Sequence, residues 1–137
     1  MPMKLLMICL FGAVVQSLPA QHTLEVTVRG IQSEKGNVLI ALYDSENTFM
    51  KDHVASRTVK ASEKEVSVTF ANLKPGNYAV TTFHDANANE KLDTNFLGIP
   101  NEAYGFSNNA KAKFGPPSFD KSSVAIDSHK KITIDLR

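Results

Sequence analysis

Short stretches of alternating apolar and polar residues dominate the chain from residue 24 onward. Residues 24–29 (LEVTVR) and 65–70 (EVSVTF) alternate with a period of two, which is typical of strands that bury one face. Residues 37–43 (NVLIALY) are apolar on both faces and predict a central strand. Further strands are expected at 57–61, 78–84, 123–127 and 130–136, with the last two forming a final pair.

Turn residues separate these strands and leave little room for helix. Gly36 is expected at positive φ, and Pro75-Gly76 predicts a tight turn with Gly76 in the left-handed position. One short helix is expected at 44–51, with Phe49 and Met50 pointing inward. The pattern predicts an all-β fold, a single immunoglobulin-like or transthyretin-like β-sandwich of about seven strands with one long ordered loop.

The first twenty residues differ from the rest of the chain. Lys4 is followed by an apolar run at 5–15 and then by a polar stretch that ends in a small residue, Ala20. This order is typical of a secretory signal peptide, and the run is shorter than the ~20 residues that span a bilayer. We expect 1–20 to be removed, with cleavage after Ala20 or alternatively after Ser17, leaving 21–137 as the β-sandwich domain in the periplasm or the medium. A buried N-terminal strand or helix is the other interpretation.

The composition of residues 21–137 limits the kinds of molecule that the domain is expected to bind. The single cysteine, Cys9, lies in the apolar run, so the mature domain must fold without disulfides. Removing Lys4 leaves 14 basic and 14 acidic residues, a net charge of zero with neutral histidines. That balance argues against a nucleic-acid partner, and no apolar segment after residue 20 is long enough to span a membrane.

Several motifs occur together in a fixed order. They are GNV at 36–38, LKPGNYAV at 73–80, HD at 84–85, FLGIP at 96–100 and YGFSNN at 104–109. In this order they resemble the secreted bacterial family called domain of unknown function 2141. The Pro-Gly-x-Tyr turn is shared by many carboxypeptidase-regulatory-like and collagen-adhesin-type sandwiches, so the chain also resembles a carboxypeptidase-regulatory-like or transthyretin-like β-sandwich. The resemblance implies an exported sandwich and no assigned activity.

The fold does not account for residues 85–119, a long stretch between two strand signals. It contains Phe96, Tyr104, Phe106, Phe114 and Phe119, whereas disordered segments are poor in aromatic residues. Loops of this length in a compact domain are usually functional when they are ordered. Either the rings pack the loop onto one sheet as a satellite core, or they form a ligand-binding surface. The packing role is the commoner one for aromatics at irregular spacing.

Residues 85–93 (DANANEKLD) place oxygen-bearing groups at alternate positions, as in a calcium-binding loop. The candidate metal ligands are the side chains of Asp85, Asn87, Asn89 and Asp93 and the backbone carbonyl of Lys91. Two positions depart from the calcium-loop pattern. Glu90 occupies the position of the glycine that makes the sharp turn, and Phe96 occupies the position of the bidentate glutamate. Asn95 or Glu102 are candidate replacements for that last ligand. The alternative is an Asx-rich turn whose side chains bond their own backbone.

These features support two hypotheses of function. The first is a non-enzymatic interaction module of the bacterial cell envelope that binds a protein or envelope component through residues 85–119, with calcium as the candidate cofactor. The second is a hydrolase-type enzyme that uses the His84–Asn109 region. Ser107, His84 and Asp85 are the residue types of a nucleophilic triad. Ser107 lacks the sequence context of a nucleophile elbow. We therefore expect no enzyme activity and name no catalytic residue.

Overall fold

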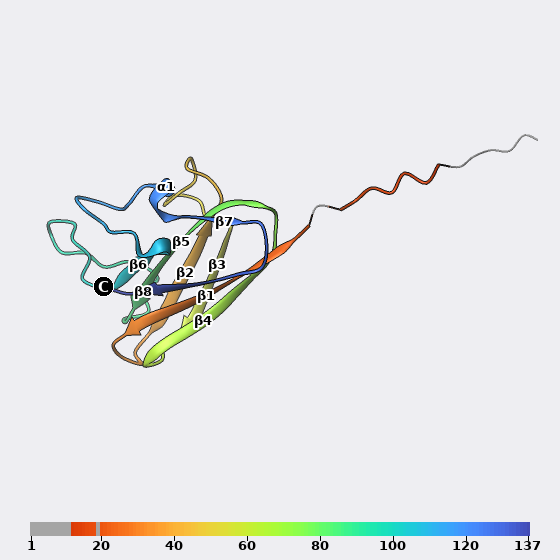
Figure 1. The fold of residues 1–137 in the computed structure, drawn as a ribbon. Helices are drawn as coiled ribbons and strands as arrows, with labels where there is room; N and C mark the ends of the chain where they lie inside the picture. Colours follow the sequence, from red (N-terminus) through yellow and green to blue (C-terminus); the bar gives the residue numbers. More distant parts are fainter. Residues whose placement is uncertain (1–11, 19) are drawn as a thin grey trace, which may run out of the picture.

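The computed structural model describes residues 12–18 and 20–137, and the part from residue 22 onward is a sandwich of two β-sheets (Figure 1). Eight strands lie in this part of the chain. Their bounds are β1 His22–Ile31, β2 Asn37–Tyr43, β3 Ala55–Lys60, β4 Lys64–Leu73, β5 Gly76–Asp85, β6 Tyr104–Phe106, β7 Ser123–Ile126 and β8 Lys130–Asp135. A 3-10 turn, η1 (Ser107–Asn109), and a four-residue helix, α1 (Phe119–Ser122), complete the set. The prediction of an all-β sandwich is confirmed.

The two sheets differ in size and in connection. One sheet has the order β4-β1-β8, in which β1 and β4 are antiparallel and β1 and β8 are parallel. The other has the order β3-β2-β5-β6, and β7 pairs with the first half of β5. In the larger sheet β5 is therefore central, and its C-terminal end leads directly into residues 85–119.

The inward faces of both sheets form one hydrophobic core. The alternating residues of β1 and β2 are fully buried, as their period-two pattern predicts. Phe70 on β4, Val80 on β5 and Ile134 on β8 fill the space between the sheets. Within residues 85–119, β6 lies against this core, since a Cβ atom on Gly105 would come within 2.6 Å of the Ile134 side chain. Phe96 and Phe114, by contrast, are exposed and lie outside the core.

Three local predictions are wrong. β7 and β8 do not pair with each other, because β7 joins β5 in one sheet and β8 joins β1 in the other. Residues 45–51 form hydrogen-bonded turns rather than a helix, and Met50 takes a φ of 64° that ends the turns and leaves its side chain 46% exposed. Phe49 is half-buried and packs edge-on against Tyr43 and Phe119, at 5.4 and 5.8 Å between ring centroids. Gly76 has an ordinary φ and begins β5, whereas Asn72 takes the left-handed conformation (φ 59°).

The segment before β1 lies outside the sandwich. Residues 12–18 run away from the domain in an extended path (Figure 1), and Val14, Val15 and Leu18 are more than four-fifths exposed. Most of the predicted signal peptide, residues 1–11 and 19, lies outside the described residues. In the described part of the chain no helix is long and apolar enough to cross a membrane.

Candidate functional site

The C-terminal end of β5 is held against the turn between β1 and β2. The buried His84 side chain donates through Nε2 to the carbonyl oxygen of Lys35 (2.7 Å). Gly36 follows at a φ of 69°, as predicted, and a Cβ atom there would lie 2.0 Å from the carbonyl oxygen of Asp85. The backbone at residue 85 is therefore packed directly on a glycine. This contact fixes where the long segment leaves the sheet.

Asp85, the first candidate calcium ligand, is completely buried and organises the turn that follows. Its carboxylate accepts the backbone N–H groups of Asn89 (3.2 Å) and Glu90 (2.7 Å). Glu90 has a φ of 63°, so the chain makes the sharp turn at this position although no glycine is present. The carboxylate of Asp85 supplies the hydrogen bonds that hold this left-handed residue in place.

Asn87, Asn89 and Asp93 converge on one point. The side-chain amides of Asn87 and Asn89 donate to the two carboxylate oxygens of Asp93, at 2.7 and 2.8 Å. These two hydrogen bonds, Asn89 first and then Asn87, lower the pKa of Asp93, and the positive charge of Lys91 acts in the same direction. Asp93 is consequently ionised at neutral pH and is available as an anionic ligand.

Glu102 hydrogen-bonds to both ends of residues 86–93. Its two carboxylate oxygens accept the backbone N–H groups of Ala86 and Asp93, each at 2.9 Å. Asn95, the other candidate for the missing calcium ligand, instead accepts from the N–H groups of Leu97 and Ile99 in a turn of its own. Of the two candidates, the structure brings Glu102 to residues 85–93 and leaves Asn95 outside.

Residues 85–93 also form the hydrogen bonds that are expected of an Asx-rich turn. The side-chain oxygens of Asn87 and Asn89 each accept an N–H group two residues further on, at 3.3 and 3.0 Å. Calcium would need the oxygens of both amides turned toward Asp93, which is a half-turn about each terminal side-chain bond. The donor set of carboxylates, amides and the Lys91 carbonyl is of the hard oxygen type that calcium prefers. Calcium binding therefore stays a prediction: Asn87, Asn89 and Asp93 converge, whereas the carboxylate of Asp85 faces the backbone N–H groups of Asn89 and Glu90.

His84 and Ser107, the pair behind the hydrolase hypothesis, are engaged separately. The buried Ser107 hydroxyl accepts the N–H group of Val80 (2.9 Å) and donates to the carbonyl of Ser122. These bonds tie η1 to β5 and α1, whereas His84 is bound to the turn before β2. Both side chains serve the packing of the domain here, and nothing in their geometry favours the hydrolase hypothesis.

The aromatic residues of 85–119 divide into two groups. Phe106 is buried, and Tyr104 and Phe119 are half-buried, with Tyr104 packing edge-on against Phe106 at 5.9 Å. Phe96 and Phe114 are fully exposed, at 95% and 112% of their reference areas. The satellite-core interpretation thus holds for three rings and fails for two. Leu97 and Ile99 are also more than half exposed.

Three of these exposed residues, Leu97, Ile99 and Phe114, line a cavity of about 670 Å³, here called the loop cavity. It lies between residues 92–100 and 112–116, which run side by side beyond the edge of the larger sheet (Figure 1). Its lining is Met50, Leu92, Leu97, Gly98, Ile99, Pro100, Tyr104, Phe106, Ala112, Phe114, Gly115 and Pro116. The lining side chains carry no charge, and the Tyr104 hydroxyl is their only polar group.

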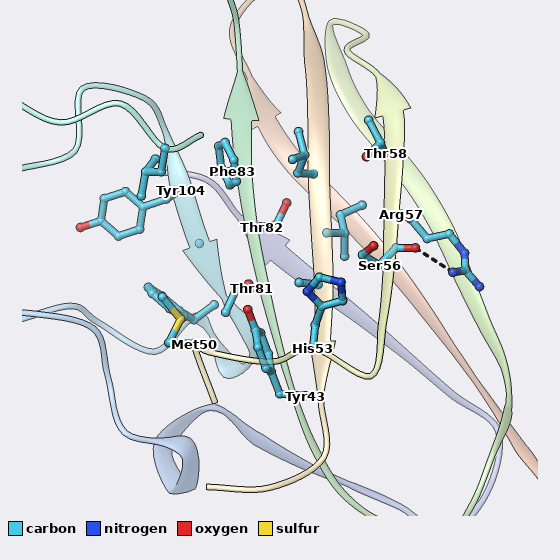
Figure 2. Close-up of a pocket in the computed structure, with 16 residues that line it drawn as sticks. Tyr43, Met50, His53, Ser56, Arg57, Thr58, Thr81, Thr82, Phe83 and Tyr104 are labelled. Carbon is cyan, nitrogen blue, oxygen red and sulfur yellow. Dashed lines mark hydrogen bonds between the residues drawn. The ribbon is translucent and has the colours of Figure 1, made fainter. Parts of the chain in front are cut away.

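A second cavity of about 300 Å³, the sheet-face cavity, lies on the outer face of β2, β3, β5 and β6. Figure 2 shows Tyr104 and Met50 at one side of it and His53, Ser56 and Thr58 toward the other. Leu39, Ala41 and Phe83 form its floor, and the two cavities share Met50, Leu92, Tyr104 and Phe106. Sequence reasoning did not identify this surface, although residues 37–43 gave a signal by being apolar on both faces.

Comparison with known proteins agrees with the motif order. The family model described as "Uncharacterized protein conserved in bacteria (DUF2141)" matches residues 26–134. The chain belongs to this family, and the match runs from the middle of β1 almost to the end of β8, covering β2 to β7 completely. No curated protein and no solved structure matches the chain. The resemblance to carboxypeptidase-regulatory-like sandwiches stays a prediction.

Proposed function

We propose that this protein is an exported, non-enzymatic binding module of the bacterial cell envelope, with residues 85–119 as its binding face. The observation that carries the proposal is the loop cavity, an apolar recess with exposed apolar residues at its rim. Apolar cavities of 300–1,000 Å³ are the usual form of ligand sites. Exposing Leu97, Ile99 and Phe114, which line the loop cavity, to water has no benefit for folding, so a binding role accounts for their exposure.

Calcium at Asp85, Asn87, Asn89, Lys91 and Asp93 is the second part of the proposal. Leu92 lies inside this segment and lines both cavities. An ion held by the residues on either side of Leu92 would fix the wall of the binding face. With two carboxylates and no bidentate glutamate in the candidate set, the site belongs to the weak extracellular class, with a Kd of roughly 10⁻⁴–10⁻³ M.

Export is the third part, and it rests on the sequence pattern of residues 1–20. It is supported by β1 beginning at His22, so that the sandwich is complete without those residues. The exposed path of residues 12–18 also leaves the region of Ala20 accessible to a peptidase. In this proposal the domain works in the periplasm or the medium, where millimolar calcium is available to a weak site.

The binding face is tested by capture from a bacterial envelope extract. The immobilised domain and its Ile99→Glu variant are compared, with lipids and proteins both identified by mass spectrometry. Ile99 lines the loop cavity, and Val54→Glu places the same charge at a similarly exposed apolar residue outside it. We expect material that the wild type and Val54→Glu retain and Ile99→Glu loses. Equal retention by all three proteins would contradict the proposal.

A further inference from the structure

The loop cavity has one wall that differs from the others, residues 110–114. Ala112 and Phe114 of this segment line the loop cavity. Lys111 and Lys113, which alternate with them, line a smaller recess of about 180 Å³ next to it. The stretch Ala-Lys-Ala-Lys-Phe, which ends in a bend at Phe114 (φ 55°), therefore presents apolar side chains to the cavity and two cations to the adjoining recess.

The two lysines are free to take a ligand. In the described part of the chain neither of them forms a salt bridge. Of the side chains that line their recess, the one carboxylate is that of Asp135, which is held by the Arg29 guanidinium (3.1 Å) and the side-chain amide of Asn109 (3.3 Å). The recess that adjoins the uncharged loop cavity thus carries two lysines without a salt-bridge partner among the described residues.

Building on the proposed function, we infer that the loop cavity binds an anionic amphiphile with a single acyl chain, of the long-chain carboxylate class. The chain lies in the loop cavity and extends over Leu92 and Tyr104, which line both cavities, to the near side of the sheet-face cavity. Arg57 lines the opposite side of that cavity (Figure 2). The anionic head stays at the rim beside Lys111 and Lys113. An uncharged lining rejects the head group, and the basic rim orients it, so the two features together select an amphiphile over a polar solute or a cation.

A lipid bilayer is the other surface that exposed phenylalanines and lysines fit. The two cases differ in what Phe96 does. Phe96 is as exposed as Phe114 but lines neither cavity, so it contributes to insertion into a bilayer and contributes nothing to a chain held in the loop cavity. Phe96→Ala and Phe114→Ala are therefore a matched pair, and neither removes a residue of the core.

The test uses the mature domain, Gln21–Arg137, with octanoate, decanoate and dodecanoate below their micelle concentrations. Binding is measured by calorimetry and by the methyl NMR signals of Ile99 and Met50. We expect saturable binding that tightens roughly threefold to fourfold per added methylene. Phe114→Ala weakens dodecanoate binding about tenfold, and Phe96→Ala leaves it unchanged. Lys111→Gln combined with Lys113→Gln weakens dodecanoate and leaves the uncharged decanol as it was.

Other results overturn the inference. Absent or chain-length-independent binding, or equal affinity for dodecyltrimethylammonium, removes the acyl carboxylate as the ligand class. Binding to phosphatidylglycerol vesicles that falls equally in Phe96→Ala and Phe114→Ala assigns the surface to a membrane instead. The proposed function is tested separately. Capture of material from the envelope extract can depend on Ile99 even if the domain does not bind dodecanoate. Loss of that dependence contradicts the binding face itself.

Discussion

Gly36 shows how a single residue sets the position of the binding face. Its Cβ would lie 2.0 Å from the Asp85 carbonyl oxygen and 2.7 Å from the Ala86 backbone. The turn between β1 and β2 can approach the end of β5 only because this residue has no side chain. The carboxylate of Asp85 then fixes Glu90, and Glu102 fixes both ends of residues 86–93.

Gly36→Ala should therefore destabilise the domain strongly. The added methyl group meets backbone atoms that cannot rotate away, and the residue is also strained at positive φ, so we expect a loss of about 3 kcal/mol or more in the free energy of unfolding. Gly98→Ala is the control, since Gly98 has a similar φ of 77° with nothing within 4 Å of its Cβ. It should cost about 1 kcal/mol. Urea denaturation measures both, and equal losses would show that the packing contact is unimportant.

At the level of single residues, the sequence predicts correctly those contacts that depend only on the spacing of side chains along the chain. The alternation in 85–93 brings Asn87, Asn89 and Asp93 together, and Glu102 reaches the same segment. The sequence could not show which end of each amide faces Asp93, because amide orientation depends on the surrounding donors. It also could not show that Phe114 is exposed while Phe106 is buried, since both follow from how the chain folds back over the sheet.

At the scale of elements, period-two alternation predicts the strands of the core well and their pairing poorly. β1, β2 and β4 lie where the pattern places them. β6 was missed because three residues containing a glycine carry no periodic signal. The pairing of β7 and β8 was wrong because the sequence between them fits a hairpin, while their apolar faces find better partners on β5 and β1.

The segment 85–93 is the element on which the calcium proposal depends. An ion that binds only the folded state raises stability as RT ln(1 + [Ca]/Kd), which at ten times Kd is about 1.4 kcal/mol. For a domain of this size we expect the melting temperature to rise by roughly 3–6 °C in calcium, and by less in magnesium. Differential scanning fluorimetry of the mature domain measures this shift.

Two variants make the calcium measurement specific. Asp93→Asn removes an anionic ligand and preserves the size of the side chain, so the calcium-dependent shift should disappear. Lys91→Ala should retain the shift, because only the backbone carbonyl of this residue is proposed as a ligand. Asp85→Ala is less informative, since Asp85 also accepts two backbone N–H groups and its loss lowers the baseline. A shift that persists in Asp93→Asn would rule out the assigned ligand set.

At the scale of the whole molecule, the core residues that stabilise the sandwich and the residues of the proposed binding face are different sets. The core fills the space between the two sheets. The sheet-face cavity lies on the outer face of the larger sheet (Figure 2), and the loop cavity is lined by residues of the long segment beyond its edge. The family match spans both parts of the molecule. Substitutions at the rim of the loop cavity should therefore change binding without unfolding the domain.

Export should leave a defined N-terminus on the mature molecule. Mass spectrometry of protein recovered from the periplasm or medium of a Gram-negative host should show a chain that begins at Gln21, or at Leu18 if cleavage follows Ser17. This expectation follows from the charge, apolar run and small residue of the first twenty positions. Exported protein that retains Met1 would refute the signal-peptide assignment.

The most direct test of the binding face is photo-crosslinking in living cells. Benzoylphenylalanine replaces Phe114 at the rim of the loop cavity or, as a control, the exposed Thr69 on β4 of the other sheet. After irradiation, mass spectrometry identifies adducts on the exported protein, whether lipid or protein. We predict an adduct of defined mass at position 114 and none at position 69. Adducts at position 69 alone, equal adducts at both positions, or none at either would contradict the account.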